Sequence, residues 1–327
     1  MLRYAEITEL QGGQAVESFY VALNAVVPLF LMIGIGCLMR QWKVIGEEAV
    51  RQANSLCFRA FMSVMMFYNV YTSDMSHAIN LPLILYCIAG ILVEFGVGYA
   101  LITRIEKRPP VQGVMIQSFF RSNAALLGVS MTAAIFTDQD ISEVAILTAV
   151  SVSMVNIMAV MTFEVFRGGK VSGKRVLRGV AKNPLVDGTM LGILASLMGL
   201  RLPSVLESTV SSIASATTPM ALVLLGASLD LRGFGSQRRN ILICLAERLV
   251  VSPAIFITLA VLLGFRGIPL AGIMVVFAGP VAIASFTVAS EMGGDSDLAA
   301  ELVVLTTGFA CFTMFGWIFL LTTLGLF

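Results

Sequence analysis

Long apolar runs, each near the length needed to cross a bilayer, recur along most of this 327-residue sequence. A bilayer core takes about 20 apolar residues of helix. Soluble domains are about one quarter charged, whereas only 13% of these residues are charged and 57% are hydrophobic. The pattern predicts an all-α membrane protein with ten transmembrane helices, at residues 19–40, 49–71, 81–103, 111–136, 142–166, 183–200, 205–229, 240–264, 268–291 and 299–325.

The charges between these runs predict how the chain is oriented. Connections on one side of the membrane hold 15 Lys and Arg residues, and those on the other side hold 3. Basic connections stay in the cytoplasm, so both termini are expected outside it, in the plasma (inner) membrane of the cell. Residues 1–18 are polar, without the apolar core of a signal peptide.

A weak internal repeat relates the two halves of the chain. Shifting the sequence by 158 residues places SEVAILTAV (142–150) on AELVVLTTG (300–308). Five runs in each half is an odd number, so the second half must be inverted relative to the first. Inverted repeats are typical of secondary transporters. The expected units are a first five-helix repeat at 19–166, a basic cytoplasmic linker at 167–182 and a second five-helix repeat at 183–327.

Two of the predicted helices contain residues that interrupt a helix in lipid. The stretch QSFFRSNAALLGVS (117–130) sets Arg, Ser and Asn inside an apolar run, and the same shift brings it onto VFAGPVAIASF. Proline and glycine disrupt regular helix, and irregular backbone at membrane depth lines a cavity or is buried in protein. Matching interruptions in two halves indicate a binding site. The candidate substrate-binding residues are Arg121, Ser122, Asn123, Gly279, Pro280 and Val281.

Ionisable residues inside the runs suggest what the site binds. A charge at bilayer centre costs about 2.5–3.5 kcal/mol on insertion scales, so Arg121 needs a cavity or a partner. Its guanidinium suits a carboxylate ligand. Alternatively, Arg121 pairs with Glu94 or Glu247 and only joins helices. These two acids lie in corresponding predicted helices and either couple transport to protons or ions, or form structural ion pairs.

Several segments together resemble one transporter family. VVPLFLMIGIGCLMRQWKVIGEEAVRQANSLCF, NPLVDGTMLGIL, TTPMALVLLGASL and FAGPVAIASFTVASEMGGDSDLAAELVVLTT are similar to auxin efflux carrier family transporters, bacterial-type members included. The resemblance covers nearly the whole chain after residue 20. It implies two inverted five-helix repeats in which helices 4 and 9 are broken and cross at the substrate site. Family members move organic anions, auxin in plants and often small carboxylates in bacteria, and are often homodimers.

These observations favour a carrier that moves a small organic anion, with the lipid bilayer as its surroundings and no nucleic-acid partner. An anion channel of the same fold, or a proton- or sodium-coupled symporter of another organic acid, remains the alternative. An enzyme is not expected, because HExxH, G-x-S-x-G and Walker motifs are absent. Five scattered cysteines and one histidine form no metal-ligand spacing, so neither a metal nor a cofactor is expected.

Overall fold

The computed structural model describes residues 27–72, 80–136, 139–166, 173–229 and 235–327. The predicted N-terminal segment 1–18 and the first part of the linker, 167–172, lie outside these residues. Five helices are long and apolar enough to cross a membrane, and a set of shorter apolar helices accompanies them. The long ones are α4 (Leu81–Ile105), α7 (Ser142–Phe166), α10 (Ser204–Ser228), the continuous α11–α12 helix (Arg238–Leu262) and α15 (Ser296–Thr323); the shorter ones are Val27–Gln41, α9 (Pro184–Leu197) and α13 (Gly267–Ala278).

Two predicted helices are each divided into two half-helices. The run 111–136 forms α5 (Pro109–Phe120) and α6 (Ala124–Ile135), and the run 268–291 forms α13 and α14 (Ala284–Met292). The breaks fall at Arg-Ser-Asn and Gly-Pro, where the sequence predicts them. Short half-helices leave main-chain groups without helical partners inside the protein, and these groups must find other partners.

Two further helices are continuous but each contains one π-helical turn. The run 49–71 forms α2 (Glu47–Leu56), the turn Cys57–Phe61 and α3 (Met62–Tyr71). The turn Glu247–Val251 joins α11 (Arg238–Ala246) to α12 (Ser252–Leu262). Such turns often lie at functional sites, and the second holds Glu247, one of the two candidate coupling acids.

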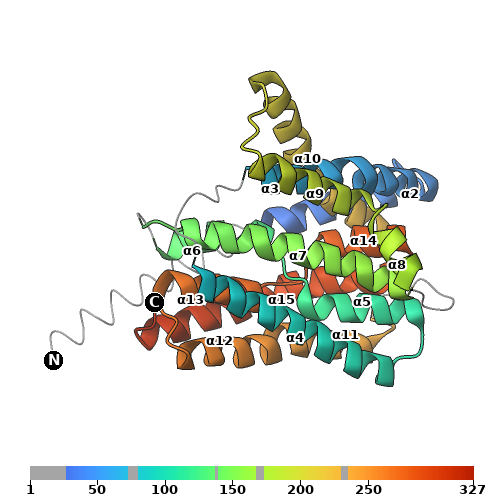
Figure 1. Cartoon of the computed structure of the whole chain (residues 1–327). Coiled ribbons are helices and arrows are strands. Elements are labelled where there is room, and N and C mark those ends of the chain that lie inside the picture. Colours follow the sequence, from blue (N-terminus) through green and yellow to red (C-terminus); the bar gives the residue numbers. More distant parts are fainter. Residues whose placement is uncertain (1–26, 73–79, 137–138, 167–172, 230–234) are drawn as a thin grey trace.

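The helices form two groups that we call the panel and the body. The panel consists of Val27–Gln41, α2–α3, α9 and α10, and the body consists of α4–α7 and α11–α15. Figure 1 shows α2, α3, α9 and α10 stacked against one side of the remaining helices. Glycines allow very close packing within the panel: a Cβ added to Gly36 would lie 2.0 Å from the Val223 carbonyl oxygen.

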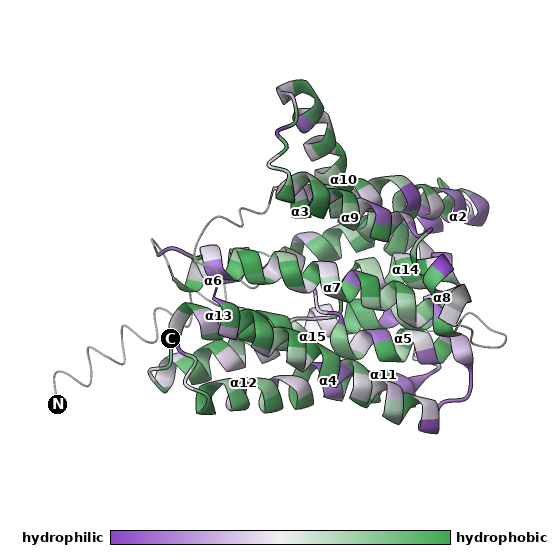
Figure 2. Ribbon diagram, viewed as in Figure 1, coloured by the Kyte–Doolittle hydropathy of each residue, from purple (hydrophilic) through white to green (hydrophobic). Residues whose placement is uncertain are grey.

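Polar residues gather at the ends of the helices. Figure 2 shows hydrophobic colour along most of the helix lengths and hydrophilic colour on α2, on α8 (Gly173–Val180) and around the α4–α5 connection. Most of the described part of the predicted linker is helical, because it forms α8. Gly179 of α8 packs directly against the Glu164 side chain of α7. In Figure 1, the α4–α5 connection and α8 lie at the end of the molecule opposite the C-terminus.

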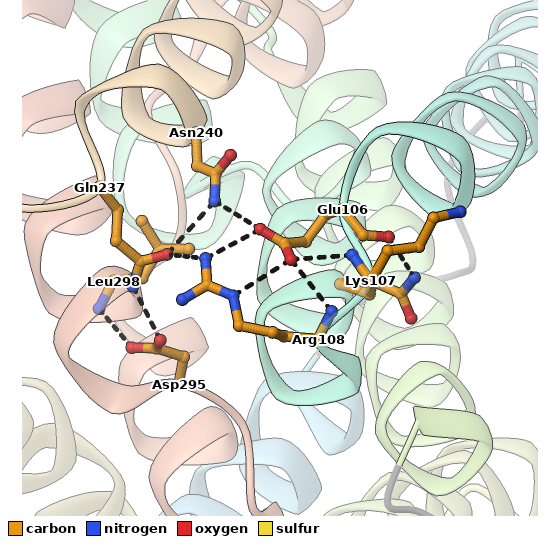
Figure 3. Close-up of polar contacts among 8 residues, drawn as sticks. Glu106, Lys107, Arg108, Gln237, Asn240, Asp295 and Leu298 are labelled. Atoms are coloured by element: carbon orange, nitrogen blue, oxygen red, sulfur yellow. Dashed lines mark hydrogen bonds and ion pairs between the residues drawn. The ribbon is translucent and has the colours of Figure 1, made fainter.

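A hydrogen-bonded network, which we call the end cluster, joins the α4–α5 connection, the start of α11 and the α14–α15 connection (Figure 3). Glu106, just after α4, accepts hydrogen bonds from the Arg108 guanidinium (2.8 and 3.1 Å) and from Asn240 Nδ2 (2.9 Å). Gln237 accepts from Arg108 (2.9 Å) and donates to Asp295 Oδ2 (2.8 Å). The hydrogen bonds from Arg108 hold the pKa of the Glu106 carboxyl far below its usual range.

The end cluster predicts a pH-dependent contribution of Glu106 to stability. Because the folded-state pKa is lowered, this contribution is present above the unfolded pKa of about 4.3 and is lost as the pH falls below it. We expect Glu106→Gln to destabilise the protein by about 1–2 kcal/mol at neutral pH. Thermal unfolding at pH 7 and near pH 3 checks this: the gap between wild type and variant should shrink on acidification. An unchanged gap would contradict the assignment.

Candidate functional site

The two helix breaks meet and pair through their main chains. Ser122 and Val281 form an isolated antiparallel bridge. The Asn123 amide donates to the Pro280 carbonyl (2.8 Å), and the Ala282 amide donates to the Arg121 carbonyl (3.1 Å). Groups that the interruptions leave without helical partners therefore satisfy each other, and the two broken helices are fixed where they cross.

A cavity of about 450 Å³ lies beside this crossover, between the panel and the body. Its volume is within the range of small-molecule sites. The body contributes residues of both breaks and of α7, and the panel contributes mostly methionine, leucine, alanine and hydroxyl side chains. The lining residues are Leu29, Met32, Met62, Met65, Met66, Tyr68, Asn69, Arg121, Ser122, Asn123, Val152, Val155, Asn156, Ala214, Ser215, Thr217, Thr218, Pro219, Ala221, Leu222, Ala282, Ile283 and Ala284.

Arg121 brings a positive charge to this cavity. Its side chain is 1% exposed and donates to Gln117 Oε1 (2.8 Å) and Asn156 Oδ1 (2.5 Å). Both acceptors are neutral amides, and among the described residues no carboxylate lies within ion-pair distance of Arg121. A guanidinium has five N–H donors. The two amides orient this one without neutralising it.

Further donors point to the same place. The Asn123 side chain is 6% exposed, and its Nδ2 has no hydrogen-bond partner. Residues 122–123 precede α6, and 282–283 precede α14, so the N-terminal ends of both half-helices lie beside the cavity. Helix N-termini carry partial positive charge and unpaired N–H groups. The body side of the cavity is therefore arranged to receive an anion.

The candidate residues from the second half have other surroundings. Gly279, Pro280 and Val281 are buried but are not among the residues lining the cavity. The Gly279 carbonyl accepts from Arg248 Nε (2.8 Å), and the Val281 amide donates to Thr306 Oγ1 (3.1 Å). At this break, the residues that reach the cavity are 282–284, just after Val281.

The two candidate coupling acids lie away from the cavity lining. Glu94 forms an ion pair with Arg248 (3.5 Å) and accepts a hydrogen bond from Ser252. Glu247 has a buried Oε2 without a hydrogen-bond partner. The alternative that joined Arg121 to one of these acids is thus not what the structure has, because Arg248 is the cation that Glu94 contacts.

Sequence reasoning missed some residues of the site. Asn156 on α7 orients Arg121, and it stands alone in an apolar run, which is the same signal that singled out Asn123. Thr217 and Thr218 line the panel side just before Pro219, inside the quoted segment TTPMALVLLGASL. Arg248 also gave a signal, a charge within a predicted span, although the sequence did not reveal its partners.

A multi-helix apolar protein with a cavity beside two crossed helix breaks has the construction of a membrane transporter. The sequence matches the family described as membrane transport protein over residues 21–318. The chain therefore belongs to this family, the auxin efflux carrier family. It is a multi-pass membrane protein and a transport protein, not an enzyme.

Two archaeal relatives match most of the chain. An uncharacterized transporter of Methanocaldococcus jannaschii is 22% identical over 314 residues, which cover 92% of this chain and 99% of the relative. An uncharacterized transporter of Methanothermobacter thermautotrophicus is 20% identical over 291 residues, covering 88% of this chain and 95% of the relative.

Proposed function

We propose that this protein is a secondary transporter that carries a small organic anion, with a carboxylate as its charged group, through the cavity beside the crossover. The observation that carries the proposal is Arg121, buried in the cavity wall without a carboxylate partner among the described residues. A buried cation is costly to leave without an anion. A carboxylate ligand would accept two parallel hydrogen bonds from its guanidinium.

The remaining cavity wall favours a substrate with a single anionic end. Across from the crossover, the panel offers apolar side chains such as Met32, Met62 and Leu222, together with the Thr217–Thr218 pair. Apolar walls bind hydrocarbon or aromatic groups, whereas a second carboxylate there would lose its hydration without a cation in return. A monocarboxylate with an apolar body fits this lining better than a dicarboxylate.

Two inverted five-helix repeats are part of the proposal, and the spacing of the two helix breaks supports them. Arg121 and Pro280 are 159 residues apart, and so are Asn123 and Ala282. Every antiparallel bridge has such local two-fold symmetry, so the support lies in the offset itself, which brings the two helix breaks onto each other. The offset exceeds the sequence-based shift by one residue. Interrupted helices at corresponding positions of two halves are typical of transporters with inverted repeats.

The transport mechanism that we propose is alternating access. The cavity is bounded by the panel on one side and the crossover on the other, so a shift of the body against the panel would change the end at which it opens. The same proposal includes the plasma membrane, with the basic connections in the cytoplasm and both termini outside. Assembly as a homodimer remains a prediction.

Counterflow in liposomes tests this function. Purified protein in liposomes preloaded with an unlabelled aromatic monocarboxylate should take up the labelled acid with saturation, and faster than liposomes that were not preloaded. A dicarboxylate should compete poorly, and protein-free liposomes provide the blank. Uptake that rises linearly and ignores the preload would indicate a channel instead. If no organic acid moves, the substrate class is wrong.

A further inference from the structure

Arg248 occupies a position on the crossover that the transport site does not use. It lies in the π-helical turn between α11 and α12, and its side chain is fully buried. It donates from Nη1 to the Phe119 carbonyl (2.7 Å), from Nη2 to the Val276 carbonyl (2.6 Å) and from Nε to the Gly279 carbonyl (2.8 Å). One guanidinium therefore contacts main-chain oxygens of both broken helices.

These oxygens belong to the C-terminal ends of half-helices. Phe119 is in the last turn of α5, Val276 is in the last turn of α13, and Gly279 follows α13 directly. Helix C-termini carry partial negative charge and unpaired carbonyls. Two such ends converge on one point, so the structure needs a positive charge there.

In secondary transporters with broken helices, unwound carbonyls and half-helix C-terminal ends are the groups that coordinate Na⁺ or H⁺. Here all three carbonyls are instead occupied by Arg248. Glu94 completes the surroundings with an anionic oxygen 3.5 Å from Nη1, and Ser252 donates to the same carboxylate oxygen. Three carbonyl oxygens and one carboxylate oxygen are the kind of ligand set that a hard cation prefers.

We propose that Arg248 is a built-in cation that takes the place of a coupling metal ion at the crossover. The π-helical turn supports this role, because the extra residue redirects the side chains of its helix. As a positioning residue, Arg248 fixes both α5 and α13, so that Arg121 and Asn123 face the cavity on the other side of the bridge. One consequence rests on the function proposed above: anion uptake requires no Na⁺.

Thermal unfolding of the full-length protein in detergent tests the inference without a substrate. Its result can therefore be interpreted even if the transport proposal fails. Wild type is measured in choline, sodium, potassium and guanidinium chlorides at equal ionic strength, and its Tm should be the same in the first three. Arg248→Ala should lower Tm by roughly 5–10 °C, because it leaves three carbonyls and Glu94 unpaired. About 10 mM guanidinium chloride should restore at least half of this loss by filling the vacated place, whereas equal urea should not.

Two further variants separate charge from general packing. Arg248→Lys keeps the charge with fewer donors and should lose less Tm than Arg248→Ala. Arg104→Ala, at an exposed arginine of α4, should neither lower Tm nor respond to guanidinium.

Four results would overturn the inference: a wild-type Tm that Na⁺ raises selectively, an Arg248→Ala variant as stable as wild type, a loss that no cation restores, or Arg248→Lys as unstable as Arg248→Ala. If Arg248→Ala does not fold, the wild-type salt series and the Arg248→Lys variant still test the inference.

Discussion

Arg121→Met should lower organic-anion uptake by roughly 10- to 100-fold, the value of one or two charge-assisted hydrogen bonds. The guanidinium lines the cavity, and its two protein contacts are neutral amides. Removing it takes away the positive charge that the substrate needs, but it also removes a buried charge that no described carboxylate neutralises. We therefore expect the free energy of unfolding to change by no more than about 1 kcal/mol. Labelled uptake and thermal unfolding are measured on the same preparation.

A matched control is Arg104→Met, which removes an exposed arginine outside the cavity and should leave uptake and stability unchanged. Arg121→Lys keeps the charge without the two-pronged geometry and should give intermediate uptake. A variant Arg121→Met that transports normally would show that the residue does not bind the substrate. One that is severely destabilised would show that Arg121 serves mainly to hold the crossover together.

Gly36→Ala should disrupt the panel, although it adds only one methyl group. The new Cβ would lie 2.0 Å from the Val223 carbonyl oxygen and 2.8 Å from the Ala227 nitrogen. Both atoms belong to the α10 main chain, so no side-chain rotation relieves the overlap and the two helices must separate. Overpacking of a well-packed interior costs about 1–3 kcal/mol and occasionally more, and we expect the upper end of this range. The measurement is the Tm and the yield of monodisperse protein.

Gly34→Ala is the matched control on the same helix, two residues away. A Cβ there meets nothing within 4 Å, so the substitution should be neutral or stabilise the helix by up to about 1 kcal/mol. The two glycines stand in the segment Gly-Ile-Gly, where the sequence permits close packing at either one. If both variants behave alike, the first helix does not pack on α10 as the structure has it.

The sequence predicted the places of the helix breaks but not all that surrounds them. Arg-Ser-Asn and Gly-Pro are strong local signals, because such residues disrupt a helix wherever it packs. The shift of 158 residues between the halves stays a prediction, and the bridge pairs residues that are 159 apart. Main-chain pairing between residues 121–123 and 280–282 depends on tertiary structure, which has no counterpart in local residue patterns.

The charged residues were likewise predicted only in part from the sequence. That Arg121 needs a cavity or a partner follows from the cost of a buried charge, and the structure provides the cavity. The alternative in which Arg121 pairs with Glu94 or Glu247 is not what the structure has, and Glu94 instead contacts Arg248. The partners of Arg248 are mainly carbonyl oxygens, which every residue carries. No side-chain pattern identifies such acceptors.

The pairing of the two breaks through main-chain atoms has a consequence for how such a protein changes over generations. Neither hydrogen bond of the Ser122–Val281 bridge uses a side chain. The side chains that face the cavity beside it can therefore be exchanged without loosening the crossing of the helices. A lineage could acquire a different cargo by replacing a few residues, such as Asn123 and Ile283, while the frame that moves the cargo stays intact. Redesign of selectivity should begin at the same positions.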